Sequence, residues 1–350
     1  MVNAINIAGR MVGLSRPCFI IAEIGVNHDG EMKKACQLVD VAVEAGADAV
    51  KFQTFVASRL ASSIAPKADY QMETTSREES QVEMLRRLEL SPQDHRELIG
   101  YCRQKNILIM STPFDEDSAD LLDELKVSVF KVPSGEITNL SFLDHVARKG
   151  KPMIVSTGMA TLGEVESAVR AVEHAGNEQI VLLHCVSSYP ACERDVNLRA
   201  MQTMADAFRV PVGYSDHTLG IEVALGAVAL GACVIEKHVT LDRTLSGPDH
   251  RCSLDPEEFS VLVRGIRKVE KALGDGIKKP VPMEMAVAAV ARKSLVAAKT
   301  ISAGTMLTGD MLALRRPGTG LPPSMRSQLV GRRAKRGISE GALLTLDMWE

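Results

Sequence analysis

The sequence has no long hydrophobic run and almost no net charge. No apolar stretch approaches the roughly 20 residues that a membrane helix needs. The first residues show no charged segment followed by an apolar core, so we expect no signal peptide. The formal net charge of −3 provides no bulk field that would attract nucleic acid. We therefore expect no membrane and no nucleic-acid partner, and an anionic substrate must be held by local lysines and arginines.

Closely spaced cysteines are also missing. An odd number of scattered cysteines, several of them inside predicted strands or helices, is typical of reduced thiols, so we expect a cytoplasmic protein. None of them has the paired spacing of a zinc site. The seven cysteines are at positions 18, 36, 102, 185, 192, 233 and 252.

The sequence does contain an eightfold alternation of short apolar runs and amphipathic stretches. Each run ends in polar or ionisable residues, and in the stretch 31–46 the apolar residues share one helical face that ends at Gly46. The pattern predicts an α/β fold, a closed (β/α)8 barrel over residues 1–280, with its site at the carboxyl ends of the strands. The runs are 18–25, 48–54, 107–113, 129–136, 153–158, 180–185, 210–217 and 233–238.

Two regions depart from the alternation. The connection from 55 to about 90 is long, and it either carries substrate contacts or is a surface excursion with one extra helix. We expect a linker over 281–291 and a small β-rich module over 292–350, in which 301–312 nearly repeats as 338–349. Such a module is too small to be very stable alone, so we expect it to pack on a barrel, its own or a partner's.

Two histidines end neighbouring strands of the predicted barrel. His217 ends the seventh strand and His238 ends the eighth, and neighbouring strands lie about 5 Å apart. The pair can share one divalent metal, with Glu23 and Asp216 as candidates to complete or orient the ligand shell. Taken alone, each histidine is better explained as an ordinary hydrogen-bonded residue than as a ligand, whereas the pair at neighbouring strand ends favours metal binding. Two histidines with oxygen partners favour loosely held Mn²⁺ or Mg²⁺ over structural zinc.

A second group at the strand ends is basic and rich in hydroxyls. Lys51 and Lys131 end the second and fourth strands, and Gly135 and Gly158 leave room for a ligand at backbone amides. This set predicts a pocket for a phosphate or carboxylate. Alternatively, each lysine pairs with a barrel carboxylate, or one of them forms a Schiff base. The serines on the same rim are Ser134, Ser156 and Ser215.

Other polar residues of the mouth have less specific signals. Glu23 and Glu136 could do acid–base chemistry or act as counter-ions for the lysines. Tyr189 in the Ser-Ser-Tyr-Pro loop could bind a polar substrate, and a Gly-Pro turn presents Asp249. Arg316 precedes a Pro-Gly turn, which indicates an exposed basic loop.

These motifs resemble, in their order, those of the sialic acid synthase family, the phosphoenolpyruvate-dependent synthases of nine-carbon ulosonic acids. The resemblance covers nearly the whole chain, and the last part resembles the antifreeze-like (SAF) module of that family. The motifs are AEIGVNHDG, AVKFQTF, STPFD, KVPSGE, STGM, LHC, YSDHT, EKHVT, SGPDH and RRPGTG.

The resemblance implies a transferase that condenses phosphoenolpyruvate with an open-chain N-acetylated amino sugar and water, releasing phosphate. His217 and His238 match ligands of a metal that polarises the aldehyde, and Glu23 matches the carboxylate of the chemical steps. Arg316 matches an arginine donated across a domain-swapped homodimer. The positions that match phosphoenolpyruvate contacts are Lys51, Thr112, Lys131, Ser134, Ser156 and Ser215, and those that match sugar contacts are Gln53, Glu136, Tyr189 and Asp249.

One departure from the family pattern concerns the loop after LHC. Val186, Ser187 and Ser188 stand where several relatives carry asparagine, which alters the expected phosphoenolpyruvate contact. The segment APKADYQ is more similar to neuraminate and legionaminate synthases than to pseudaminate synthases. We predict an N-acetylneuraminate synthase that uses N-acetylmannosamine. The alternatives are a legionaminate synthase that uses a 2,4-diacetamido hexose, or a pseudaminate or spore-coat relative.

Overall fold

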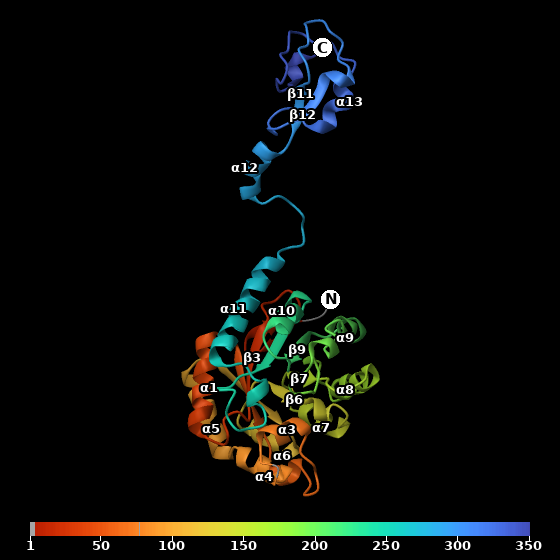
Figure 1. The fold of residues 1–350 in the computed structure, drawn as a ribbon. Coiled ribbons are helices and arrows are strands. Elements are labelled where there is room, and N and C mark those ends of the chain that lie inside the picture. Colours follow the sequence, from red (N-terminus) through yellow and green to blue (C-terminus); the bar gives the residue numbers. More distant parts are fainter. Residues whose placement is uncertain (1–3, 77) are drawn as a thin grey trace. The chain divides into compact units, whose positions relative to one another are not determined.

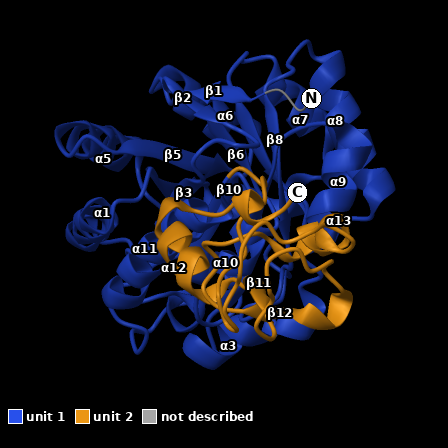
Figure 2. Ribbon diagram, turned by 90° about the horizontal axis from the view of Figure 1, so that it is seen from above, with its two compact units in different colours: residues 1–274 blue, residues 275–350 orange. Residues whose placement is uncertain are grey.

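The computed structural model describes residues 4–76 and 78–350, which divide into two compact units (Figure 2). The first unit ends at Gly274, and the second runs from Asp275 to Glu350. All seven cysteines are free. None of the described helices combines the length and apolar character needed to cross a bilayer.

Eight parallel strands form a closed barrel in the first unit (Figure 1). The last strand pairs with both its predecessor and the first strand, so the sheet has no free edge. This confirms the predicted barrel and all eight runs. The strands are β3 (Phe19–Gly25), β4 (Ala49–Thr54), β5 (Leu108–Pro113), β6 (Phe130–Val132), β7 (Met153–Ser156), β8 (Ile180–Cys185), β9 (Val212–Asp216) and β10 (Val234–His238).

A main helix follows each strand, and several of these helices have strong end signals. Asp255 caps the last one by accepting the backbone N–H of Glu258, and Pro256 occupies its first turn, as predicted. Gly46 ends the first one with a φ of 82°. The helices are α1 (Met32–Ala45), α5 (Pro92–Gln104), α6 (Glu116–Glu124), α7 (Leu140–Ala147), α8 (Leu162–His174), α9 (Ala200–Phe208), α10 (Glu222–Ala229) and α11 (Pro256–Leu273).

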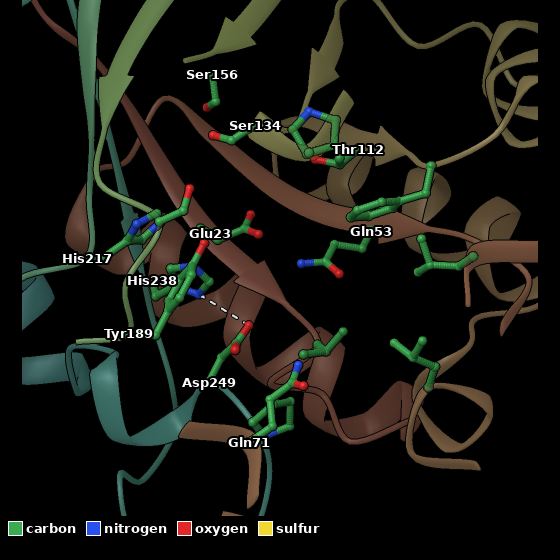
Figure 3. Close-up of a pocket in the computed structure, with 18 of the residues that line it drawn as sticks. Glu23, Gln53, Gln71, Thr112, Ser134, Ser156, Tyr189, His217, His238 and Asp249 are labelled. Atoms are coloured by element: carbon green, nitrogen blue, oxygen red, sulfur yellow. Dashed lines mark ion pairs between the residues drawn. The ribbon is translucent and has the colours of Figure 1, made fainter. Parts of the chain in front are cut away.

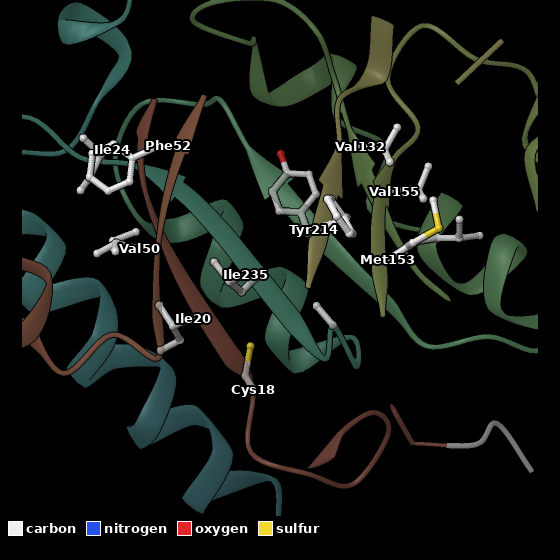
Figure 4. Close-up of a cluster of buried hydrophobic side chains, with 14 of the residues drawn as sticks. Cys18, Ile20, Ile24, Val50, Phe52, Val132, Met153, Val155, Tyr214 and Ile235 are labelled. Carbon is white, nitrogen blue, oxygen red and sulfur yellow. The ribbon is translucent and has the colours of Figure 1, made fainter. Parts of the chain in front are cut away.

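The side chains of each strand alternate between the outside and the inside of the barrel. They form one apolar layer outside, one apolar layer inside, and a polar layer inside nearer the carboxyl ends of the strands. Phe52 and Ile20 point outward into the core between strands and helices (Figure 4), whereas Ile21 points inward. A hairpin of β1 (Ile5–Ile7) and β2 (Arg10–Val12) adds its apolar residues to the inner cluster. The polar inward residues lie nearer the carboxyl ends of the strands, where they form the site.

The long connection between β4 and α5 contains three short helices rather than one. They are α2 (Ala57–Leu60), α3 (Asp69–Thr74) and α4 (Gln81–Leu88). The reading as a surface excursion with one extra helix is therefore wrong. Several of its side chains line the cavity described below, which supports the reading as a source of ligand contacts.

The second unit begins with a helix and continues as a small β-rich module. The expected linker 281–291 is occupied by α12 (Pro282–Ala291), and β11 (Ser294–Ala297) pairs antiparallel with β12 (Leu312–Arg315). The two near-repeats meet at an antiparallel bridge between Ile301 and Ile338. The module has its own apolar core, which also buries Trp349. Its remaining helix is α13 (Arg326–Leu329).

Candidate active site

A cavity of about 530 Å³ lies at the carboxyl ends of the barrel strands (Figure 3). This is the place that the fold predicts for a site, and the volume is typical of small-molecule cavities. The structure brings together most of the residues predicted from the sequence. Those lining the cavity are Glu23, Lys51, Gln53, Thr112, Lys131, Ser134, Ser156, Tyr189, Ser215, His217, His238 and Asp249.

The two lysines form the cationic part of the cavity. Lys51 Nζ lies 2.9 Å from Glu23 Oε2 and donates to Thr112 Oγ1 at 3.0 Å. Lys131 Nζ donates to Ser156 Oγ at 2.7 Å. Both lysines are almost completely buried, so each needs nearby acceptors to offset lost hydration. Fixed ammonium groups next to hydroxyls suit an anionic ligand.

A second glutamate, Glu236, lies between the lysines. Its carboxylate is 3.6 Å from Lys131 Nζ and 3.8 Å from Lys51 Nζ, and Ser215 Oγ donates to it at 2.8 Å. It was not among the predicted site residues, although strand alternation places it on the same face of β10 as His238. The lysines therefore pair with barrel carboxylates, as one prediction stated, and they also line the cavity, as the prediction of an anion pocket requires.

The pKa values of the two lysines and the two glutamates shift in different directions. Burial raises the pKa of Glu23 to about 7, although Lys51 opposes this shift. For Lys51 and Glu236, burial disfavours the charged forms but the opposite charges outweigh it, so the Lys51 pKa is raised and the Glu236 pKa is lowered. Burial lowers the pKa of Lys131. Glu23 is therefore the group suited to exchange a proton near neutral pH.

The predicted histidine pair is present, with ring centroids 5.5 Å apart. His217 Nδ1 donates to the carbonyl oxygen of Val186 at 2.7 Å, which leaves its Nε2 as the unprotonated nitrogen. His238 Nδ1 is buried, has no hydrogen-bond partner, and lies 3.8 Å from Asp249 Oδ2. Burial lowers the pKa of His217 to about 4 and shifts that of His238 in the same direction. Both rings are therefore neutral, which is the form that binds metals.

These features fit a weakly held divalent ion with two protein nitrogen ligands. The observation that favours an ion here is the Nδ1 atom of His238, which is buried and has no hydrogen-bond partner among the described residues. Within residues 4–76 and 78–350, no group of three or more histidine, cysteine, aspartate or glutamate side chains has metal-binding geometry. The other coordination positions would fall to water and substrate, as in catalytic rather than structural sites.

Asp216 does not take part in this arrangement, so its predicted role near the metal shell is wrong. Its carboxylate accepts from Lys237 Nζ at 2.7 Å and from the backbone N–H of Thr218 at 2.9 Å, on the outer side of the barrel. The physical reason is alternation: Ser215 and His217 point inward, so the residue between them points outward.

Tyr189 and Asp249 border the histidines. The ring centroid of Tyr189 is 4.2 Å from that of His217 and 5.1 Å from that of Tyr70. Burial raises the pKa of Asp249 to about 6, against the influence of His250 and Lys51. These groups offer an aromatic face and a carboxyl group to a polar ligand.

Glu136 and Arg316 have different surroundings. Glu136 ends the turn η1 (Ser134–Glu136), and its carboxylate accepts from the side-chain amide of Asn139 at 2.8 Å. Arg316 belongs to the second unit, where its Nε donates to the carbonyl oxygen of Ala291 at 3.0 Å.

Sequence reasoning missed several residues that line the cavity besides Glu236. Ser187 lies close to Gly158, and Tyr70 and Gln71 come from the β4–α5 connection. The length of this connection was a signal for contacts, but it did not indicate which residues make them. The departure at Ser187 places a hydroxyl beside that of Ser134 near the same glycine.

Comparisons with known proteins agree with this arrangement. The NeuB family model matches residues 38–278 and the SAF domain model matches 292–350. The chain is 50% identical over 342 residues to the N,N'-diacetyllegionaminic acid synthase of Legionella pneumophila, covering 97% of this chain and 95% of the relative. It is 48% identical over 327 residues to the enzyme of the same name from Campylobacter jejuni, covering 93% and 98%.

A solved structure shows the same fold. The N-acetylneuraminic acid (sialic acid) synthetase of Leptospira borgpetersenii, in complex with citrate, superposes with a TM-score of 0.73 at 36% identity, covering 82% of this chain and 95% of that one. The barrel, the cavity and these matches lead to one conclusion: the chain belongs to the NeuB family and carries a C-terminal SAF domain.

Proposed function

We propose that this protein is a transferase that joins phosphoenolpyruvate to a 2,4-diacetamido hexose, giving N,N'-diacetyllegionaminic acid and phosphate. The observation that carries the proposal is the buried polar layer at the barrel mouth, where Lys51 and Lys131 lie beside a pair of neutral histidines. The names of the two relatives favour this acceptor over N-acetylmannosamine, which the sequence motifs alone favoured. N-acetylneuraminate synthesis is the second candidate.

In this proposal the lysine end of the cavity holds phosphoenolpyruvate. Lys51 and Lys131 offset part of the charge of the phosphate and carboxylate, and the hydroxyls of Ser134 and Ser156 donate to their oxygens, with Ser215 beside them. The supporting observation is that both ammonium groups are buried and already held by hydroxyl partners, so little reorganisation is needed on binding.

The histidine end is where we place the aldehyde of the acceptor. His217 and His238 would hold Mn²⁺ or Mg²⁺ there, and the ion would supply Lewis-acid polarisation of the carbonyl. The stacking of Tyr189 on His217 limits where the acceptor chain can lie. Proximity then brings the carbonyl carbon to C3 of phosphoenolpyruvate.

Glu23 is the proposed proton carrier. C3 of phosphoenolpyruvate forms the new bond to the aldehyde carbon, and the aldehyde oxygen takes up a proton. Water adds at C2 and loses a proton. The C2–oxygen bond to phosphate then breaks, its electron pair leaves on the phosphate, and the C2 hydroxyl gives up its remaining proton to leave the keto acid. A carboxyl group with a pKa of about 7 can both give and accept these protons.

We also propose a domain-swapped homodimer in the cytoplasm. The support for the dimer is a resemblance. The RRPGTG segment resembles a family segment whose arginine, matched here by Arg316, reaches the site of the other subunit. The free cysteines support a reducing compartment.

A phosphate-release assay tests the function. Release should require phosphoenolpyruvate, a divalent ion and an amino sugar together, and it should be faster with the 2,4-diacetamido hexose than with N-acetylmannosamine. Equal release in the presence of EDTA would refute the metal role, and no release with any amino sugar would refute the function. Borohydride trapping of a pyruvate adduct on Lys51 or Lys131 would instead indicate a Schiff-base enzyme.

A further inference from the structure

The cavity has two kinds of wall, and the proposed chemistry uses only one of them. The strand ends supply charged and hydroxyl groups. Part of the opposite lining is aliphatic and comes from the β4–α5 connection, residues 56–90. We define the alkyl wall as the side chains of Leu60, Met84, Leu85 and Leu88.

We infer that the alkyl wall contacts the end of the acceptor sugar that lies farthest from its aldehyde, and that this contact determines which acceptors are used. It would select an acceptor that carries an acylamino group and a deoxy, methyl-bearing terminus there. The inference rests on the proposed function, because it needs the aldehyde at the histidine pair.

The wall is a firmly built part of the fold. Ser80 caps α4 by accepting the backbone N–H of Glu83 at 3.2 Å, and the Glu83 carboxylate accepts from the Ser80 N–H at 2.9 Å. Met84 and Leu88 are four residues apart, so they share one face of α4. That face is buried in a cluster with Val26 and Phe55, and Leu60 and Leu85 pack against the same cluster.

The orientation of the acceptor follows from the two ends already assigned. Figure 3 shows Gln53 across the cavity from His217, on the strand end that leads into the β4–α5 connection. An acceptor with its aldehyde at the histidines therefore extends past Gln53 toward the alkyl wall. Among the described residues, the side-chain amides of Gln53 and Gln81 make no hydrogen bond, and both line the cavity.

The chemistry of this wall discriminates between acceptors. A hydroxyl group pressed against alkyl side chains loses its hydrogen bonds to water, which is costly when it has no partner. An acceptor that places a methyl group there, instead of lacking it, should have a kcat/KM about tenfold or more higher. The amides of Gln53 and Gln81 can pair with the N–H and carbonyl of an acylamino group. The wall thus suits a diacetamido, deoxy sugar better than a polyhydroxylated one.

The test compares two matched variants of α4. Leu85→Asn changes the wall, and Val82→Asn makes a comparable change at a half-buried position on the same helix outside the wall. The acceptors are a 2,4-diacetamido-6-deoxy hexose, its 6-hydroxy analogue and N-acetylmannosamine. Leu85→Asn should lower kcat/KM for the diacetamido-deoxy sugar about tenfold, with the phosphoenolpyruvate KM and the N-acetylmannosamine value within about twofold of wild type. Val82→Asn should change none of these ratios.

A binding measurement separates this inference from the proposed function. In saturation-transfer NMR, the methyl protons of the diacetamido-deoxy sugar should receive more saturation than its chain protons in wild type and Val82→Asn, and should lose it in Leu85→Asn. Equal methyl saturation in all three proteins, or equal loss of kcat/KM for all acceptors, would overturn the inference. Absence of phosphate release with every acceptor would instead overturn the proposed function, and the NMR comparison would still decide the role of the wall.

Discussion

Glu23 shows how burial and neighbouring charges set the pKa of a side chain at the barrel mouth. Its carboxylate lies against Lys51, which lowers its pKa. Burial and the negative charge of the neighbouring Glu236 both act in the opposite direction and raise the pKa to about 7. Glu236 accepts from Ser215 and faces both lysines, so it remains the ionised member of the pair. Their different surroundings therefore shift the pKa values of two identical carboxyl groups in opposite directions.

The raised pKa of Glu23 predicts a pH-dependent stability. A carboxyl group whose pKa is higher in the folded state stabilises the fold below its unfolded pKa, and this contribution is lost as pH rises through about 7. The free energy of unfolding of Glu23→Gln relative to wild type should therefore increase from pH 4.5 to pH 7.5, by on the order of 3 kcal/mol. Urea denaturation of the barrel at both pH values measures this difference.

The same variant tests the proposed role of Glu23 in proton transfer. Glu23→Gln should lower kcat by about 10²-fold or more and leave the phosphoenolpyruvate KM nearly unchanged, because glutamine keeps the shape but cannot carry a proton. The exposed Glu44 on α1 provides the matched control, Glu44→Gln, which should leave kcat and the pH dependence of unfolding unchanged. A normal kcat for Glu23→Gln would exclude this residue as the proton carrier.

At the scale of elements, the neighbouring strands β9 and β10 are joined by an ion pair outside the barrel. Lys237 Nζ lies 2.7 Å from Asp216 Oδ2 and also donates to the carbonyl oxygen of Thr218 at 2.6 Å. Both side chains are fully buried. The pair joins the two strands whose next inward residues are His217 and His238.

Removing one partner of this pair should be costly. Lys237→Met leaves the Asp216 carboxylate buried without its counter-ion, so we expect a loss of about 3–5 kcal/mol in the free energy of unfolding. Thermal unfolding followed by circular dichroism measures the loss. Lys279→Met removes a lysine from an exposed pair with Asp275 and should leave the midpoint unchanged. A similar midpoint for both variants would contradict the structural role of the buried pair.

The loop between β7 and α8 brings Gly158 against the cluster of hydroxyls. A Cβ atom at this position would lie 2.8 Å from Ser134 Oγ and 2.9 Å from Cys185 Sγ. Gly158→Ala should therefore raise the phosphoenolpyruvate KM by about 5- to 150-fold, the equivalent of 1–3 kcal/mol of overpacking. Steady-state kinetics measure the effect.

A nearby glycine provides the control for this loop. Gly163 lies in the first turn of α8, and a Cβ there would meet no atom within 4 Å. Gly163→Ala should leave the phosphoenolpyruvate KM unchanged. If both variants raise KM equally, the close packing at Gly158 is not what shapes the lysine end of the cavity.

At the scale of the whole molecule, the barrel mouth contains the carboxyl, ammonium and imidazole groups of the cavity, while Arg316 lies in the SAF domain. The proposed dimer predicts complementation in trans. Arg316→Ala and Glu23→Gln should each be poorly active alone. A mixture refolded together should regain up to about a quarter of wild-type activity, because half of the chains would form mixed dimers with one intact site. Sedimentation velocity should show a dimer, and a fully active monomer would contradict the proposal.

The sequence by itself determined the strands and most of the residues that line the cavity. Alternation along β4 and β10 is enough to place Lys51, Gln53 and His238 inward, because side chains of a strand alternate strictly between two faces. Short apolar runs and capping residues such as Asp255 predicted the strand and helix positions for the same local reason. These features depend on neighbours in the chain.

Only the tertiary structure decided which polar groups meet. Glu236 lies between two lysines from different strands, and Asp216 turns out to face Lys237 rather than the histidines. The packing of Leu85 and its neighbours beside the site likewise depends on where α4 folds over the mouth. Such contacts join residues far apart in the chain, and burial, which sets the pKa of Glu23, exists only once the barrel has closed.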